Sequence, residues 1–307
     1  MRVTHSMLSD TAVASLMRSL ERLQHVQEQI TTGRNYQLPS ENPTAATQIV
    51  RFTSKVAEIE QYRLAISNGI AWNEMTSTVL TEIEDLLAEA LDVSERFSNS
   101  AATSAERELA AATIESLLEE LVMTANRSFK EKYILGGTRT LTAPFTAQYD
   151  GDGELITGVS PNPQGLTGVW SYRVSEVETM RMNTRGNEVL QPIGQGFEGD
   201  VFKVLVRLRE AFEDGDFDAM ATEEGELREA ISRVVAINAR VGSRVNRLEA
   251  MDADLETQVL TYEGQRSELE DTDLAEAIVE FNTADTVYQA ALASTARILQ
   301  LSLADFL

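Results

Sequence analysis

The chain contains no cysteine and only two histidines in its 307 residues. The lack of cysteine excludes a disulfide scaffold, a thiolate zinc site and a cysteine nucleophile. The two imidazoles, those of His5 and His25, would lie roughly 30 Å apart on one helix, which is too far to share a metal ion. Because neither histidine has evident co-ligands, we expect both to be structural or surface residues, and we expect no cofactor and no bound metal.

Proline, glycine and aromatic residues are also scarce, with 6 prolines, 17 glycines and an aromatic content of 6%. This composition favours long helices over a sandwich or a barrel. The sequence lacks a glycine-rich nucleotide loop, a paired-histidine metalloprotease motif and a Gly-x-Ser-x-Gly nucleophile motif. Carboxylates are abundant, but no two of them stand out as an acid and a base. We therefore predict that the protein is not an enzyme.

Basic residues are outnumbered by acidic residues, 26 to 49, which gives a net charge of −23. Because this charge repels phosphate, we expect no nucleic-acid partner. No run of about 18 apolar residues is present, so we expect no membrane insertion. The N-terminus lacks a cationic start followed by an apolar core, which argues against a cleaved secretory signal. The protein is then cytoplasmic, or it is exported by a route that reads another signal.

Two acidic stretches have the alternating spacing of a calcium-binding loop, at residues 150–154 and 214–218. The glycine that such a loop requires at its sixth position is Leu155 in the first stretch and Ala219 in the second. We therefore interpret the first stretch as a hairpin turn and the second as a solvated helix–helix turn.

The chain is rich in apolar residues at helical spacing. Residues 9–32 are predicted to form a first helix, with Gln27 at the one unfilled position of a heptad seam. Gly33 follows, at a place where helices prefer a residue that tolerates positive φ. The apolar seam consists of Val13, Leu16, Leu20, Leu23 and Ile30.

A second, longer helix is predicted to start near Pro43, and Arg63 interrupts its apolar seam. Its two halves are out of phase across residues 71–78, which predicts a change of winding or of partner there. Ser104 is a plausible N-cap for a third helix, whose apolar face is expected to extend to Phe129.

The pattern changes between residues 136 and 199, where glycines, prolines and turn dipeptides such as Asp150-Gly151 accumulate. Short β-prone runs, for example Trp170 to Val174, lie among them. This segment is predicted to be a small β-rich insert.

Helices are predicted to return at Asp200. The segment 227–262 has a strict heptad pattern, with Asn238 and Asp252 as polar breaks. The last helix, residues 274–303, has a stripe of larger residues and a ridge of small residues beside it. Two such faces indicate contact with more than one neighbour. The larger residues are Leu274, Ile278, Phe281, Tyr288, Leu292, Thr295 and Leu299, and the small-residue ridge is Ala277, Ala284 and Ala291.

Heptad helices at both ends of the chain need partners, and the simplest arrangement pairs the two ends with each other. The predicted fold is therefore mainly α, a long antiparallel coiled coil or helical bundle built from both ends of the chain, with a small central β-rich insert. Three domains are expected: residues 1–40 with 270–307, residues 41–135 with 200–269, and residues 136–199.

A two-helix coiled coil leaves part of each apolar flank exposed, and such surface is typical of an assembly site. We therefore expect the terminal domain to assemble with other chains. The expected interface comprises Val13, Leu16, Leu20, Leu23 and Ile30 from the first helix, and Leu274, Ile278, Phe281, Tyr288, Leu292 and Leu299 from the last.

Several segments resemble those of bacterial flagellin-like proteins, in particular the hook-associated members of that family. The N-terminal matches are Met1–Thr4, Glu28–Arg34 and Pro39–Ala46. The borders of the insert are matched by Tyr133–Arg139, Pro144-Phe145, Met182–Gly186 and Gly199–Phe202. The tail Leu299–Leu307 is similar too, although an aromatic residue often stands in the family at the position of Ala304.

The resemblance implies a structural protein of the bacterial flagellum that acts as an adaptor between hook and filament. It implies export through the flagellar type III apparatus, without a cleaved signal, to an extracellular location. The implied partners are like subunits in a ring, the neighbouring hook-associated junction protein, flagellin and a flagellar export chaperone.

Three alternatives remain open at this stage. The first is a flagellin filament subunit, against which the short insert and the ending of the chain argue. The second is a coiled-coil enzyme with a site in the β-rich insert, and the third is a cytosolic coiled-coil scaffold.

Overall fold

The computed structural model describes residues 5–98, 102–162, 166–191 and 199–304, and it leaves the side chains of residues 5, 6, 8, 9 and 298–304 undescribed. The motif matches at residues 1–4 and 305–307 lie outside this description. The chain divides into two compact units, one formed by residues 1–58 with 257–307 and the other by residues 59–256. The division into three domains stays a prediction about which parts fold independently.

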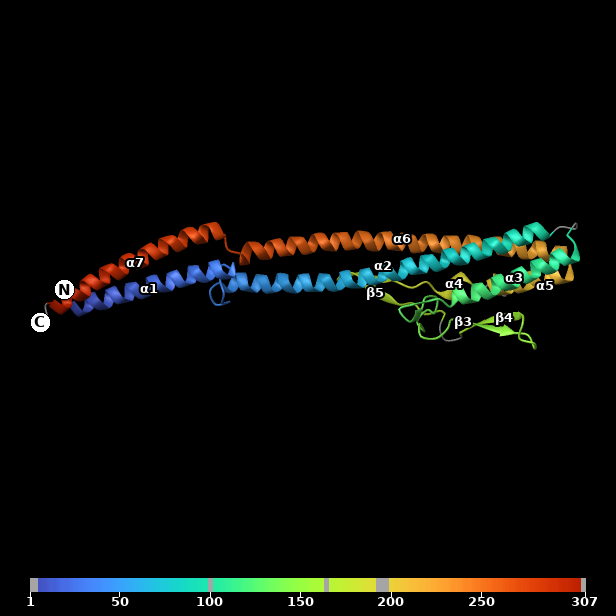
Figure 1. The fold of residues 1–307 in the computed structure, drawn as a ribbon, viewed down its shortest axis with the longest axis horizontal. Coiled ribbons are helices and arrows are strands. Elements are labelled where there is room, and N and C mark those ends of the chain that lie inside the picture. Colours follow the sequence, from blue (N-terminus) through green and yellow to red (C-terminus); the bar gives the residue numbers. More distant parts are fainter. Residues whose placement is uncertain (1–4, 99–101, 163–165, 192–198, 305–307) are drawn as a thin grey trace. The chain divides into compact units, whose positions relative to one another are not determined.

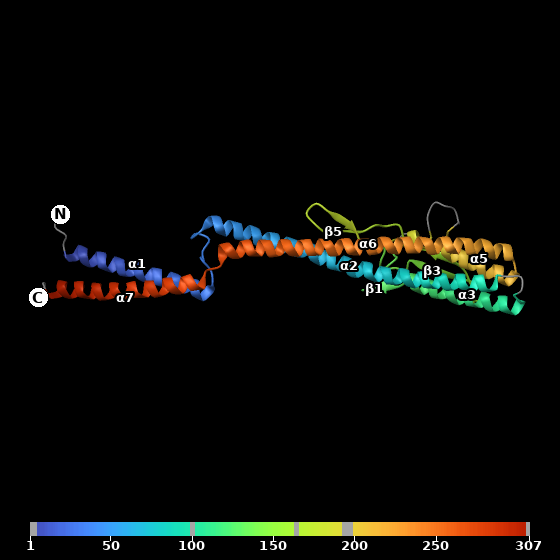
Figure 2. The ribbon, with the colours of Figure 1, turned by 90° about the horizontal axis from the view of Figure 1, so that it is seen from above.

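In the first unit, the helices from the two ends of the chain pack along each other in opposite directions. Helix α1 is His5–Thr32 and helix α7 is Leu274–Ala304 (Figures 1 and 2). Gly33 ends α1 with a φ of +70°, as its position in the sequence predicted. The connectors are hydrogen-bonded to each other, since Asn35 N donates to Glu270 O (2.8 Å) and Thr272 N donates to Gly33 O (2.9 Å).

The two longest helices are α2, Pro43–Phe97, and α6, Phe217–Glu270. In the second unit they are joined where each heptad seam is interrupted. Arg63 Nε on α2 donates to Asp252 Oδ1 on α6 at 2.9 Å, and Ser77 Oγ donates to Asn238 Oδ1 at 2.7 Å. The polar breaks of one seam thus meet polar groups of the other, which fixes the register of the pair. The predicted pairing of distant helices is confirmed.

Helix α2 runs without a break through residues 71–78, where the sequence predicted a change. Two smaller helices, α3 (Ser104–Ala125) and α5 (Val201–Asp214), join α2 and α6 to form the core of the second unit (Figure 1). After residue 78, α2 buries adjacent pairs of residues, Val79 with Leu80 and Leu86 with Leu87. The change of phase therefore marks a wider buried face and additional partners, with no change of winding.

Two details of α3 differ from the sequence prediction. Its N-cap is Thr103, one residue before Ser104, because Thr103 and Glu106 form a reciprocal capping box. The helix ends at Ala125, so Phe129 does not lie on its face and belongs instead to a strand. Asp200 caps α5 as expected, and Gly215 ends that helix with a φ of +70°.

The β-rich insert is confirmed, and it consists of two-stranded antiparallel pairs in the described part of the chain. Its strand pairs are β3 (Phe145–Tyr149) with β4 (Ile156–Pro161), and β5 (Ser171–Arg173) with β6 (Thr179–Arg181), followed by the short helix α4 (Gly186–Val189). A further pair, β1 (Ser128–Phe129) with β2 (Lys132–Tyr133), lies just before the predicted start of the insert.

A buried ion pair holds the β3–β4 hairpin on the helices. Arg209 on α5 donates through Nη1 to Glu115 Oε2 on α3 (2.6 Å) and to the carbonyl of Ile156 (3.0 Å). Glu115 Oε1 accepts the backbone N–H of Ile156 at 2.7 Å. An isolated two-stranded hairpin is marginally stable in water, so these contacts are what position β3 and β4.

Leu248 lies in the α2–α6 seam and is fully buried, whereas Leu64 on α2 is 67% exposed. Leu248→Ala is expected to lower the free energy of unfolding by about 2–5 kcal/mol, because it removes buried apolar contacts and leaves a cavity. Leu64→Ala, the matched control, should change it by less than about 0.5 kcal/mol. Denaturant unfolding followed by circular dichroism measures both; equal effects would contradict the assignment of the seam.

Candidate assembly site

The face of α1 that packs on α7 contains the predicted apolar seam, with differences at Val13 and Val26. Leu16, Leu20, Leu23 and Ile30 are half-buried. Val13, at the start of the seam, is 39% exposed. The most buried residue of α1 is Val26, at 1% exposure, which the sequence interpretation missed because it placed Gln27 at the vacant heptad position. The spacing contained the signal, since Val26 lies three residues after Leu23 and four before Ile30.

On α7, the small residues face the partner helix with two aromatic residues beside them, whereas Leu274, Ile278 and Leu292 remain open. Ala277, Ala284 and Thr295 are buried. Phe281, Tyr288 and Ala291 are half-buried beside them. Arg22 on α1 reaches across the contact to Glu280 at 2.7 Å. Small side chains at intervals of seven residues let the two helices approach closely along this line.

The open stripe of α7 is formed by Leu274, Ile278 and Leu292, which are 50%, 50% and 47% exposed. At 100° per residue these three residues share one face of the helix, adjacent to the small-residue ridge. Leu299 falls on the same face, but its side chain lies outside the described residues. Asp285 lies on this face between Ile278 and Leu292 and accepts a hydrogen bond from Gln289 at 2.8 Å. The helix pair thus leaves apolar side chains of α7 uncovered on either side of a polar position.

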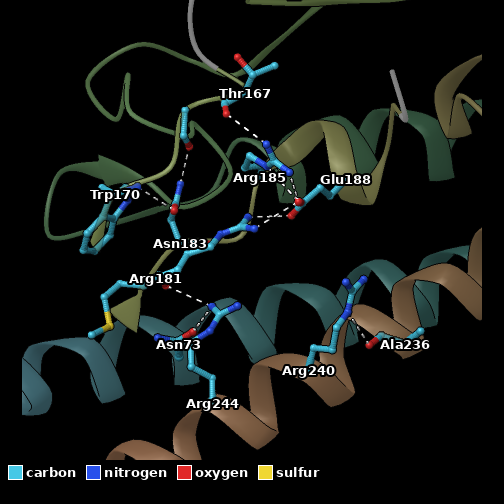
Figure 3. Close-up of polar contacts among 12 residues, drawn as sticks. Asn73, Thr167, Trp170, Arg181, Asn183, Arg185, Glu188, Ala236, Arg240 and Arg244 are labelled. Atoms are coloured by element: carbon cyan, nitrogen blue, oxygen red, sulfur yellow. Dashed lines mark hydrogen bonds and ion pairs between the residues drawn. The ribbon is translucent and has the colours of Figure 1, made fainter. Parts of the chain in front are cut away.

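A second polar site attaches the insert to the long helices in the second unit (Figure 3). Arg244 on α6 donates to Asn73 Oδ1 on α2 (2.8 Å) and to the carbonyl of Met182 in the insert (3.4 Å). Gly69 on α2 makes this approach feasible, since a Cβ there would lie only 2.7 Å from the sulfur of Met182. The insert is therefore held by close packing as well as by hydrogen bonds.

Within this polar site, two arginines converge on a single carboxylate. Arg181 Nη2 donates to Glu188 Oε2 at 2.7 Å, and Arg185 also hydrogen-bonds to Glu188 (Figure 3). Burial works to raise the pKa of Glu188, but the hydrogen bonds and charges of Arg181 and Arg185 overcome it and hold that pKa at about 2. Burial also lowers the pKa of the Arg244 guanidinium, and the charge of Arg181 lowers it further.

One carboxylate in the second unit both lines a cleft and caps a helix. A cleft of about 800 Å³ lies between β4 and α5, and the carboxylate of Asp200 lines it. That carboxylate caps α5 by accepting the N–H groups of Phe202 and Lys203, and burial raises its pKa. No group of three or more potential metal ligands occurs among the described residues. None of the helices in the described ranges has both the length and the apolar character needed to cross a bilayer.

Comparison with known proteins finds the same relatives at both ends of the chain. Residues 3–140 match the bacterial flagellin N-terminal helical region, and residues 225–307 match the bacterial flagellin C-terminal helical region. The chain is 24% identical over 315 residues to flagellar hook-associated protein 3 of Escherichia coli (strain K12), covering 99% of this chain and 98% of that protein.

Two solved structures share the fold. A putative flagellar hook-associated protein from Vibrio parahaemolyticus has a TM-score of 0.66 at 20% identity, covering 75% of this chain and 100% of the other. The flagellar junction protein FlgL from Legionella pneumophila has a TM-score of 0.57 at 14% identity, covering 73% of this chain and 99% of the other.

The Glu188 carboxylate gives the stability of the insert a pH dependence, because it links Arg181 on β6 and Arg185 to α4 within the insert. Its pKa in the folded protein, about 2, lies below the ordinary value of 4.5, so its stabilisation is complete above about pH 4.5 and is lost as the pH falls towards 2. At neutral pH, Glu188→Gln should cost about 1–3 kcal/mol of unfolding free energy, after partial screening by solvent.

The difference in unfolding free energy between wild type and Glu188→Gln should become smaller as the pH falls from about 4.5 towards 2. Denaturant unfolding at a series of pH values measures it. The exposed Glu249, changed to Gln, is the control. A difference that stays constant down to the lowest accessible pH would show that the charge of Glu188 is not responsible.

Proposed function

Because the chain belongs to the flagellin-like family, we propose that it is a structural component of the bacterial flagellum that connects the hook to the filament. The observation that carries this proposal is the match to hook-associated protein 3 over 99% of the chain. The flagellin-type regions at both ends support the same role, because they form the paired helices through which such a subunit would assemble.

Assembly is proposed to proceed through the terminal helices α1 and α7. In a single chain α1 covers the small-residue ridge of α7 and part of Phe281 and Tyr288, whereas Leu274, Ile278 and Leu292 remain half-exposed. Burial of a Leu or Ile side chain contributes roughly 1.5–3 kcal/mol. A ring of like subunits would bury the stripe against neighbouring copies and so drive the association.

The further partners in this proposal are the neighbouring hook-associated junction protein, flagellin and an export chaperone. The chain would reach its extracellular place in the flagellum through the type III apparatus, without a cleaved signal. The absence of a recognisable catalytic arrangement among the described residues supports a structural role rather than an enzymatic one.

A flagellin filament subunit is the second candidate, and the flagellin-type terminal regions favour it equally. A strain that lacks the gene separates the two. Loss of a junction protein should leave hooks that secrete unpolymerised flagellin, because the filament has no base on which to grow. Loss of a filament subunit should leave hooks that still carry their junction proteins.

The strain test is read by electron microscopy of isolated hooks and by immunoblots of the culture supernatant. The matched control is the same strain complemented with the intact gene, which should restore filaments and swimming. Normal filaments in the deletion strain would overturn both candidates.

The double variant Ile278→Glu, Leu292→Glu places two charges on the open stripe of α7. It should shift the unfolding free energy of the second unit by less than about 0.5 kcal/mol, because both positions are exposed and lie in the other unit. Incorporation at hook tips and motility should be lost. Removal of residues 275–307 should have the same effects.

The control is Ala290→Glu, Ser294→Glu, which adds the same charge to exposed positions on the opposite face of α7. It should assemble normally. If the stripe variant still assembled on hooks, the assignment of this surface would be wrong.

A further inference from the structure

An aromatic cavity lies in the second unit between α2, the β1–β2 pair and the start of β5. Its volume is about 390 Å³, and it is lined by Trp72, Phe129, Trp170 and Tyr172 together with Lys130 and Lys132. These include both tryptophans of a chain in which aromatic residues make up only 6%. Clustered Trp and Tyr side chains in a concave surface are typical of the centre of a protein–protein contact.

The aromatic side chains form one connected group. The ring of Trp72 lies 6.2 Å from that of Phe129 and 5.3 Å from that of Trp170, both edge-on, and Trp170 is 5.1 Å from Tyr172. Asn183 fixes the backbone of Trp170 by accepting its N–H at 3.1 Å (Figure 3). Neither indole N–H has an acceptor among the described residues. Both indole nitrogens are buried, so they are closed to an incoming partner.

The cavity is also cationic, which is unusual in a chain of charge −23. Lys130 and Lys132 are two of only four lysines, and neither forms an ion pair with a carboxylate in the described ranges. Lys130 lies over the ring of Phe129 at 5.2 Å. Lys130 and Glu131 have φ values of +50° and +62°, in a turn that normally selects glycine or asparagine. The chain thus keeps a strained turn beside the cavity.

The complementary feature is the tip of the β3–β4 hairpin. Residues 150–154 have the sequence Asp-Gly-Asp-Gly-Glu, in which Asp150 is half-buried and residues 151–154 are exposed. Asp150 is engaged by the turn, since its Oδ1 accepts the N–H groups of Glu154 and Leu155. The carboxylates of Asp152 and Glu154 form no ion pair with any described residue. The tip therefore presents two free negative charges.

The tip and the cavity belong to different ends of the insert. Both views place β3 and β4 apart from β5 along the length of α6 (Figures 1 and 2). Glu115 and Arg209 anchor the hairpin to α3 and α5 in its own chain. The tip of one copy is therefore available to the cavity of another. Head-to-tail contacts of this kind close into a ring when the rotation between copies permits it.

We propose that the aromatic cavity binds the acidic β3–β4 tip of a neighbouring copy of this chain, through Lys130 and Lys132 and the rings beside them. The proposal deepens the proposed function, in which like subunits form a ring, by naming a second contact between copies besides the terminal helices. Opposite charges in such a contact select the partner and set its register.

Tryptophan fluorescence tests the proposal, because Trp72 and Trp170 are the only tryptophans and both line the cavity. The full chain is titrated with a synthetic peptide of residues 147–157. We expect a saturable change in emission that high salt weakens. A peptide with Asp152→Asn and Glu154→Gln should bind at least about tenfold more weakly, as loss of a pair of complementary charges implies.

Variants of the protein locate the contact. Lys130→Gln, Lys132→Gln should weaken binding of the native peptide by at least about tenfold. The matched control Lys55→Gln, at a lysine outside the cavity, should bind normally. A charge-reversed protein, Lys130→Glu and Lys132→Glu, should recover binding of a peptide with Asp152→Lys and Glu154→Lys. This rescue excludes misfolding as the cause of weak binding.

The proposal is overturned if no emission change occurs up to millimolar peptide, or if the neutralised peptide binds as well as the native one. It is also overturned if a polyglutamate peptide or a neutral glucan oligosaccharide binds as tightly, since the occupant would then be another acidic partner or a sugar. These titrations use purified protein, so they decide the contact whatever the hook experiments show. Failure at the hook would instead count against the proposed function.

Discussion

The structure depends on the pairing of α2 with α6, two helices that are separated in sequence by the whole β-rich insert. An apolar seam supplies the attraction, but apolar contacts alone tolerate slippage by a heptad. Polar pairs between the two helices prevent this slippage, because Arg63 hydrogen-bonds to Asp252 and Ser77 hydrogen-bonds to Asn238. A slip would place these half-buried polar groups against apolar side chains, at a cost that a correctly registered pair avoids. The register of this pair in turn sets where the insert and the smaller helices attach.

The insert shows that a small β segment can depend on the neighbouring helices for its stability. Each strand pair is too small to persist alone. The Glu115–Arg209 pair holds β3 and β4, Arg244 holds the backbone just after β6, and the Arg181–Glu188 pair links β6 to α4 within the insert. In both places charged groups from helices satisfy backbone groups of the insert. The glycine at position 69 completes this attachment by allowing Met182 to rest on α2. The insert is thus stabilised by its contacts with the helices.

The sequence predicted the helices, their pairing and the insert well because these follow from local periodicity and composition. Its errors were local ones: it chose Ser104 over Thr103 as a cap, extended α3 to Phe129 and omitted Val26. The aromatic cavity was not predictable in this way. Trp72, Phe129 and Trp170 belong to three segments whose meeting depends on tertiary topology, and no spacing in the sequence brings them together. The same holds for Glu115 and Arg209, which read as ordinary charged positions on two separate helices.

Helix α7 has one side that packs on α1 in its own chain and another that, in the proposed assembly, would contact other chains. Ala277 and Ala284 at the contact with α1 allow close approach, and Phe281 and Tyr288 beside them bury part of their apolar surface there. In the proposed assembly, Leu274, Ile278 and Leu292 on the open side would be buried by contacts between chains. Because strongly acidic chains repel one another, such apolar surfaces, together with local cationic sites, are what association between copies requires.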